Sequence, residues 1–201
     1  MNINEQLRDQ IDLAFNEATL LGIEFKKEKS IVACTFDLIT MNKNGEVPKD
    51  KRLLFIFKSV GRFVASLRNA RWDDSTAKAE IFDYHNIGEV VQKFGARSIY
   101  GWEFINRGNE IYDTWKDRLS FDFNSNHTSG LTNTIDLFQE NYNKHIDIRI
   151  WFDSFDILTP NYESVELEEF LENGKRGWEA IYSNNPRMQS FGIFPGSNDI
   201  E

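Results

Sequence analysis

The residues best suited to binding a ligand gather between positions 62 and 72, where three arginines and one tryptophan occur within eleven residues. These are Arg62, Arg68, Arg71 and Trp72. Guanidinium groups bind carboxylates through paired hydrogen bonds, and they stack on planar groups such as indole rings. The pattern predicts a site that clamps a carboxylate or stacks on a planar ligand. The structural alternative is that the arginines pair with Asp73, Asp74 and acids of neighbouring strands.

A second candidate group consists of Tyr100, Trp102 and Glu103, and it begins 28 residues after Trp72. Two rings beside a carboxylate predict an aromatic wall of a binding site. The same residues are equally typical of the core and rim of a β-sheet.

The chain has 3 histidines, of which His127 and His145 lie near aspartates. Asp122, His127 and Asp136 lie around one loop, and His145 and Asp147 share one side of a strand. Imidazole and carboxylate groups together bind divalent metals, or act as a base and the group that orients it. Of these residues, Asp122, His127, His145 and Asp147 are the metal candidates, and the alternative is ordinary exposed histidines in polar turns.

Established catalytic motifs are missing from the sequence. It has no glycine-rich phosphate loop, no Gly-x-Ser-x-Gly, no His-Glu-x-x-His and no Cys-x-x-Cys. The only cysteine, Cys34, lies in an apolar strand-like run, which predicts a buried, inert thiol. The sequence therefore favours a protein that is not an enzyme, and it predicts no catalytic residue and no cofactor.

Composition and charge restrict the partners. The 201 residues include 17 Phe, 6 Tyr and 5 Trp, which favours a β-rich core. The net charge is -9 and the pI about 4.9, so phosphate backbones and anionic lipid are repelled. We expect no nucleic acid or membrane partner, and a basic protein partner is allowed. The chain shows neither a signal-peptide pattern nor an apolar run of ~18 residues, so a cytoplasmic, soluble protein is expected.

Periodicity predicts the elements that must position these residues. Apolar positions from Ile3 to Ala18 form one stripe of a helix, with Asn2 or Asn4 as its cap and Asp12 on the solvated face. Alternating patterns predict strands at residues 21–25, 31–38, 53–57, 62–68, 76–84, 98–105, 119–123, 131–140 and 146–152. Asn44-Gly45 predicts a turn that pairs the second and third of these strands in antiparallel fashion.

Three further helices complete the expectation. A short helix should cover residues 87–94 and end before Gly95. Another should run from the capping Ser164 to the stop at Gly174, with a short one around 178–182 and an irregular tail from about 184. Together they predict a single α+β domain over 1–201, with a large, mainly antiparallel sheet or flattened barrel of about eight strands. The N-terminal helix and the C-terminal helices should pack on it, and the oligomeric state is left open.

The protein resembles bacterial immunity proteins in its small size, its acidity and its aromatic-rich sheet. The resemblance is one of general type and includes no shared motif. That resemblance implies a non-catalytic domain that binds a protein partner, here a basic one docking on an acidic surface such as residues 163–172. Two alternatives stay open. One is a small-ligand-binding domain whose aromatic-lined pocket has Arg62 or Trp102 at its wall. The other is a metal-assisted hydrolase that uses His127 or His145 with a nearby aspartate.

Overall fold

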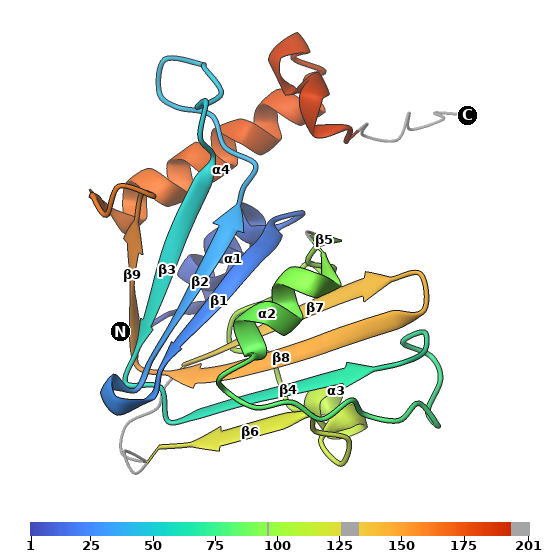
Figure 1. The fold of residues 1–201 in the computed structure, drawn as a ribbon. Coiled ribbons are helices and arrows are strands. Elements are labelled where there is room, and N and C mark those ends of the chain that lie inside the picture. Colours follow the sequence, from blue (N-terminus) through green and yellow to red (C-terminus); the bar gives the residue numbers. More distant parts are fainter. Residues whose placement is uncertain (96, 126–132, 194–201) are drawn as a thin grey trace.

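The chain folds into two antiparallel β-sheets that share one core, with a helix near each end of the chain (Figure 1). The computed structural model describes residues 1–95, 97–125 and 133–193. The predicted α+β class and mainly antiparallel sheet are confirmed. Ten strands form among the described residues, in two sheets that do not close into a barrel.

The larger sheet has six strands in the order β10-β9-β3-β2-β1-β5, and all its neighbours are antiparallel. The predicted pairing of the second and third strands is confirmed, with Cys34 opposite Phe55. Its strands are β1 (Thr19–Lys26), β2 (Ile31–Asp37), β3 (Arg52–Lys58), β5 (Arg97–Ser98), β9 (Ser154–Leu158) and β10 (Ser164–Val165).

The smaller sheet has four strands in the order β6-β4-β8-β7, again antiparallel. Its strands are β4 (Arg62–Arg68), β6 (Phe121–Asn124), β7 (Asn133–Asn141) and β8 (Lys144–Phe152). The chain bends between β3 and β4 at Ser59, whose positive φ of 50° turns it from one sheet into the other. As a result the strands of the two sheets run at a steep angle to each other (Figure 1).

Phenylalanine rings join the sheets and helices into one core. Helix α1 (Glu5–Phe15) carries Phe15, whose ring lies 5.1 Å from Phe36 and 4.8 Å from Phe55 between centroids. Phe57 of the larger sheet lies 4.9 Å from Phe152 of the smaller one. Such ring pairs stabilise a core beyond the area they bury. The aromatic-rich composition therefore serves the contact between the two sheets.

Two predicted strands, at 76–84 and 98–105, are wrong. Apart from Ser98, which lies in β5, both segments are irregular connections that make single bridges, Arg68 with Ala79 and Ile105 with Ile135. Their alternating residue types do not match burial, because Ile81 is 76% exposed beside the buried Phe82, while Phe104 and Ile105 are both buried. Backbone N–H groups of these segments bond instead to other partners, such as Phe82 N to Ser120 O and Tyr100 N to Phe138 O. The first segment bonds to Leu67 of β4 and to Ser120 just before β6, and the second follows the edge strand β7, where Asp136 N donates to Phe104 O.

The predicted stop at Gly174 is also wrong, because helix α4 (Leu167–Tyr182) continues through it, and Ser164 lies in β10. Gly174 faces helix α1, where an added Cβ would lie 2.8 Å from Ala14 Cβ. The glycine thus permits close helix packing and does not cap the helix. The expected irregular tail contains a 3₁₀ helix, Pro186–Phe191.

The helix from Ile87 to Phe94, α2, ends at Gly95 as predicted, with a positive φ of 94° at that glycine. A six-residue helix, α3 (Glu110–Trp115), has no counterpart among the predicted elements. In the described part of the chain, every helix is too short or too polar to cross a bilayer.

Replacing Gly174 with alanine tests the close packing of α1 and α4. Helix propensity alone would favour the alanine by ~1 kcal/mol. We expect a net loss of about 1–3 kcal/mol of unfolding free energy in urea, because the new methyl group pushes the helices apart. The loss should shrink in an Ala14→Gly background. Gly22→Ala is the control, since an added Cβ there meets nothing within 4 Å. A Gly174→Ala protein more stable than the original would contradict the packing.

Candidate functional site

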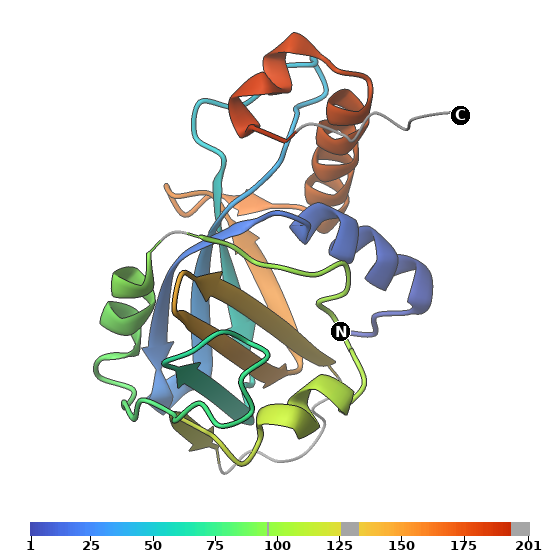
Figure 2. The ribbon, with the colours of Figure 1, turned by 90° about the vertical axis from the view of Figure 1, so that its right-hand side faces the viewer.

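The outer face of the four-stranded sheet, the one turned away from the larger sheet, carries charged side chains that are buried beneath a cover. Strand alternation places fourteen side chains there: Arg62, Val64, Ser66, Arg68, Asp122, Asn124, Thr134, Asp136, Phe138, Glu140, His145, Asp147, Arg149 and Trp151. Figure 2 shows the loop that follows β4, together with helix α3, in front of this face. Between cover and sheet lies a cavity of about 820 Å³, a size that suits a small molecule.

An ion pair between Arg68 and Asp147 forms part of the cavity floor. The register sets Ser66 opposite Asp147, so Arg68 lies diagonally across from Asp147 on the neighbouring strand. Arg68 Nη2 donates a hydrogen bond to Asp147 Oδ2, and the two side chains are only 5% and 8% exposed. Burial raises the pKa of Asp147 to about 6, although Arg68 and Arg118 lower it. Burial also lowers the pKa of Arg68.

A second buried pair joins Asp136 and Arg149, which lie directly opposite each other on β7 and β8. Arg149 Nε lies 3.3 Å from Asp136 Oδ1. Burial raises the pKa of Asp136 to about 6, again against the effect of arginine charges. Carboxyl groups with a pKa near 6 can exchange protons with a bound molecule at neutral pH, so both aspartates are candidates for proton transfer.

Arg149 also fastens the start of α3 to the sheet. Its Nη2 donates to Arg107 O at 2.7 Å and to Gly108 O at 3.0 Å, and its Nη1 donates to Asn109 Oδ1 at 3.1 Å. The guanidinium lies 5.4 Å from the centroid of the Tyr112 ring on α3. Arg149 is thus a positioning residue for the roof of the cavity.

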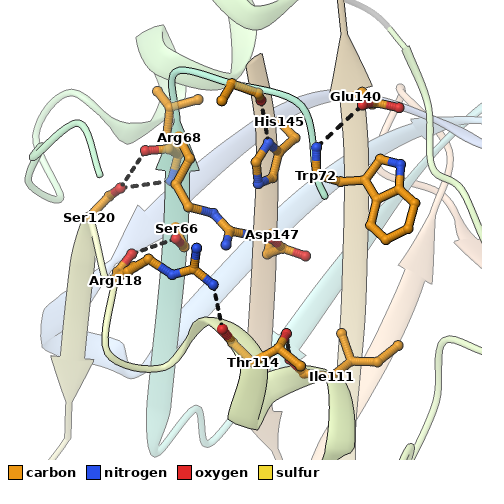
Figure 3. Close-up of polar contacts among 12 residues, drawn as sticks. Ser66, Arg68, Trp72, Ile111, Thr114, Arg118, Ser120, Glu140, His145 and Asp147 are labelled. Atoms are coloured by element: carbon orange, nitrogen blue, oxygen red, sulfur yellow. Dashed lines mark hydrogen bonds and ion pairs between the residues drawn. The ribbon is translucent and has the colours of Figure 1, made fainter. Parts of the chain in front are cut away.

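His145 holds the other part of the cover. It is fully buried, and its ring Nδ1 bonds to Ala70 O, so Nδ1 carries the proton. Burial, together with the positive charge of Arg68, lowers the pKa of His145 and keeps the ring neutral. The remaining ring nitrogen, Nε2, has no hydrogen-bond partner in the described part of the chain. His145 does not line the cavity and acts as an anchor for the loop after β4 (Figure 3).

Arg118 connects the two parts of the cover and lines the cavity. Its Nη1 donates to Ser75 O at 2.9 Å, and its Nη2 donates to Thr114 O at the end of α3. The Ser66 hydroxyl donates in turn to the carbonyl oxygen of Arg118. Figure 3 shows the Arg118 and Arg68 side chains on one side of Asp147 and the Trp72 ring on the other.

Aromatic and apolar side chains complete the cavity. Trp72 comes from the loop after β4, Tyr100 from the loop before α3, and Phe138 from β7. Trp115 and Ile111 come from α3. The cavity thus combines an aromatic lining with a few charged groups, as small-ligand sites commonly do.

Asp12 positions the loop that carries Tyr100. Its Oδ1 accepts hydrogen bonds from Phe104 N at 2.9 Å and Ile105 N at 3.0 Å. The prediction that Asp12 lies on a solvated helix face is wrong, because the residue is 4% exposed. The helical period places it on the polar face, and the sequence does not show the loop that buries it.

The structure brings together Arg68, Trp72, Tyr100 and Asp147 of the predicted site residues, all of which line the cavity. Arg62 does not: it donates to Asp122 Oδ2 at 2.7 Å and lies over the Trp151 ring.

The remaining predicted site residues lie apart from the cavity. Arg71 is exposed and 3.7 Å from Asp73, and Glu103 is exposed and 3.8 Å from Arg107. Trp102 is 71% exposed and does not line the cavity. His127 lies outside the described residues. In the three described segments, no group of three or more His, Cys, Asp or Glu side chains is placed to hold a metal ion. Cys34 is buried, which raises the pKa of its thiol.

Sequence reasoning placed Asp136 only in the loop around His127, and it missed several other cavity residues, namely Arg107, Ile111, Trp115 and Arg118. Asp136 had a usable signal, because its position on an alternating strand sets it on the same face as Phe138 and Glu140. The α3 residues had none, since six residues are too few for a helical period.

Comparisons with known proteins give no relative. No protein-family model matches the chain, and the searches of curated proteins and of solved structures found no match either.

Removing the Asp12 carboxylate should loosen the loop that carries Tyr100. In Asp12→Ala, two buried N–H groups lose their acceptor, so we expect a loss of about 2–4 kcal/mol in urea unfolding. Amide exchange at Phe104 and Ile105 should also become faster. Asp9→Ala, on the exposed side of α1, is the control and should change stability by less than about 0.5 kcal/mol. Equal losses in the two variants would contradict the role of Asp12.

The two buried aspartates should titrate about two units above an exposed aspartate. In a carboxyl ¹³C NMR titration, we expect midpoints near 6 for Asp136 and Asp147. Asp50 should titrate near 2, because Arg52 lowers its pKa. Since the folded pKa exceeds the unfolded one, each buried carboxyl should cost up to about 3 kcal/mol of stability as pH rises from about 4 to 6. Midpoints near 4 for both would contradict their burial.

Proposed function

We propose that this protein binds a small, partly aromatic molecule in the cavity on the outer face of the four-stranded sheet. The observation that supports the proposal is the cavity itself, about 820 Å³ in volume and lined by Trp72, Tyr100, Trp115 and Phe138 above buried ion pairs. Packed sheet faces have no need for such a space.

The construction of the cover supports this reading. Four separate anchors hold it above the sheet: the Arg149 bonds to the loop before α3, the His145 bond to Ala70, the Arg118 bonds to the loop and α3, and the Asp12 bonds to the Tyr100 loop. A cover with fixed anchors keeps a cavity open without a ligand, so less ordering is needed when one binds.

A protein partner is the second candidate, favoured by exposed aromatic side chains. Trp72 is 60% exposed, Trp102 71% and Tyr142 95%. Exposed tryptophan and tyrosine are frequent anchors of protein interfaces. Trp102 distinguishes the two candidates, because it does not line the cavity. It should contribute to binding a protein partner on the surface and not to binding a ligand in the cavity.

A neutral aromatic probe tests the first candidate. N-phenyl-1-naphthylamine fluoresces more strongly in apolar surroundings, and we expect a saturable, single-site titration with the protein. Trp72→Ala should weaken the affinity about 5- to 10-fold, because it removes one aromatic wall. Trp102→Ala is the matched control and should change it less than about twofold. Equal losses in both variants, or no saturable binding, would contradict the proposed cavity function.

A further inference from the structure

We propose that the ligand of this cavity carries an anionic group, a carboxylate or a phosphate, which Arg118 binds with Arg68 as the second positive charge beside it. This inference rests on the proposed ligand-binding function and specifies the chemistry of the ligand. It assigns the anion to one side of the cavity and the aromatic part of the ligand to the side of Trp72 (Figure 3).

The buried charges on the cavity floor are already paired. Asp147 is the hydrogen-bonded partner of Arg68, and Asp136 is the ion-pair partner of Arg149. Each buried carboxylate is therefore matched by a buried guanidinium, as burial of charge requires. These two pairs leave Arg118 without a carboxylate in ion-pair contact among the described residues, although its charge acts on the carboxyl groups of Asp147 and Asp74.

Among the described residues, Arg118 is held in place by backbone carbonyl groups and not by a carboxylate. In the described part of the chain it makes no ion pair, and the hydrogen bonds of its guanidinium go to backbone carbonyl oxygens of Asp74, Ser75 and Thr114. Those bonds hold the side chain in place without neutralising it. Its half-buried position lets the guanidinium face the cavity, where a charge-assisted bond to an anion is stronger than in open water.

The other acidic residues that line the cavity, Asp73 and Glu140, have other neighbours. Asp73 is 3.7 Å from Arg71, so an exposed arginine already faces it. Glu140 lies near Trp72, whose backbone N–H points to Glu140 Oε1 at 3.5 Å. In Figure 3, Glu140 lies on the Trp72 side of Asp147, and Arg118 lies on the other side. An anion beside Arg118 would thus lie across Asp147 from Glu140.

The net charge of -9 does not oppose this assignment. Repulsion from distant surface acids is screened over about 10 Å in ordinary buffer, whereas the Arg118 guanidinium, which has no ion-pair partner among the described residues, acts at short range. The overall charge would instead select small anions over extended polyanions such as nucleic acid.

Three naphthalene probes that differ in one substituent test the inference by titration calorimetry at pH 7.5. They are 1-naphthol, 1-naphthoate and 1-naphthyl phosphate, which carry no charge, a carboxylate and a phosphate. We expect at least one of the two anions to bind about tenfold or more tightly than 1-naphthol. The better of the two identifies the source of the anionic group.

Variants at Arg118 locate the preference. Arg118→Gln should remove the preference for the anion and leave the affinity for 1-naphthol within about twofold. Arg118→Lys should keep part of the preference, because it keeps the charge and loses the two-pronged geometry. Lys116→Gln is the matched control: it removes an exposed positive charge from the same segment, off the cavity, and should keep the full preference.

The outcomes separate the inference from the function on which it rests. Equal affinities of all three probes for the original protein would overturn the anionic site and leave the cavity function standing. An anion preference that survives in Arg118→Gln, with folding verified by near-UV circular dichroism, would also overturn it. If none of the probes and no N-phenyl-1-naphthylamine bound, the cavity function itself would fail.

Discussion

The buried ion pair of Arg68 and Asp147 is the interaction on which the rest of the structure depends. On most two-layer proteins the outer face of a sheet is wet, and charged side chains there need no partner. Here both side chains lie under a cover and have lost most of their hydration, so each buried charge needs the other as its partner. The high pKa of Asp147 reflects the same burial. The floor is therefore polar yet largely shielded from solvent by the cover, which strengthens electrostatic contacts with a ligand.

The cover exists because several buried polar groups hold it there. Arg149 binds the segment before α3, His145 binds Ala70, and Asp12 binds the loop of Phe104. Each anchor joins residues far apart in the chain, by 42, 75 and 92 positions. The loops thus owe their conformation to the sheet and to α1 more than to their own sequences, and a fixed cavity follows from that dependence. Arg118, bonded to both the loop and α3, adds an unpaired positive charge to this fixed frame.

Most strands and the first helix could be predicted because period and caps are local: Asn4 accepts from Leu7 N as expected. The strands β9 and β10 of the larger sheet were not among the predicted ones. The 76–84 and 98–105 segments could not be predicted, since their alternating residue types do not correspond to alternating burial: Ile81 is exposed, and the consecutive Phe104 and Ile105 are both buried. The role of Gly174 could not be predicted either, because glycine occurs both at helix ends and where two helices pack closely. Of the site, Arg68 and Asp147 were found separately, on two strands, and their pairing depends on register across 79 residues. Arg118 follows no periodic pattern, and its role comes only from the folded loops.

The central claim is that the outer sheet face is a buried, ion-paired floor. A double-mutant cycle with Arg68→Met and Asp147→Leu measures it directly in urea unfolding. Each single variant leaves one buried charge without its partner and should lose about 3–5 kcal/mol, and the double variant should lose less than either single one. That result would establish strong coupling in a dry environment. Losses that simply add, with a coupling below about 0.5 kcal/mol as for exposed pairs, would contradict the account.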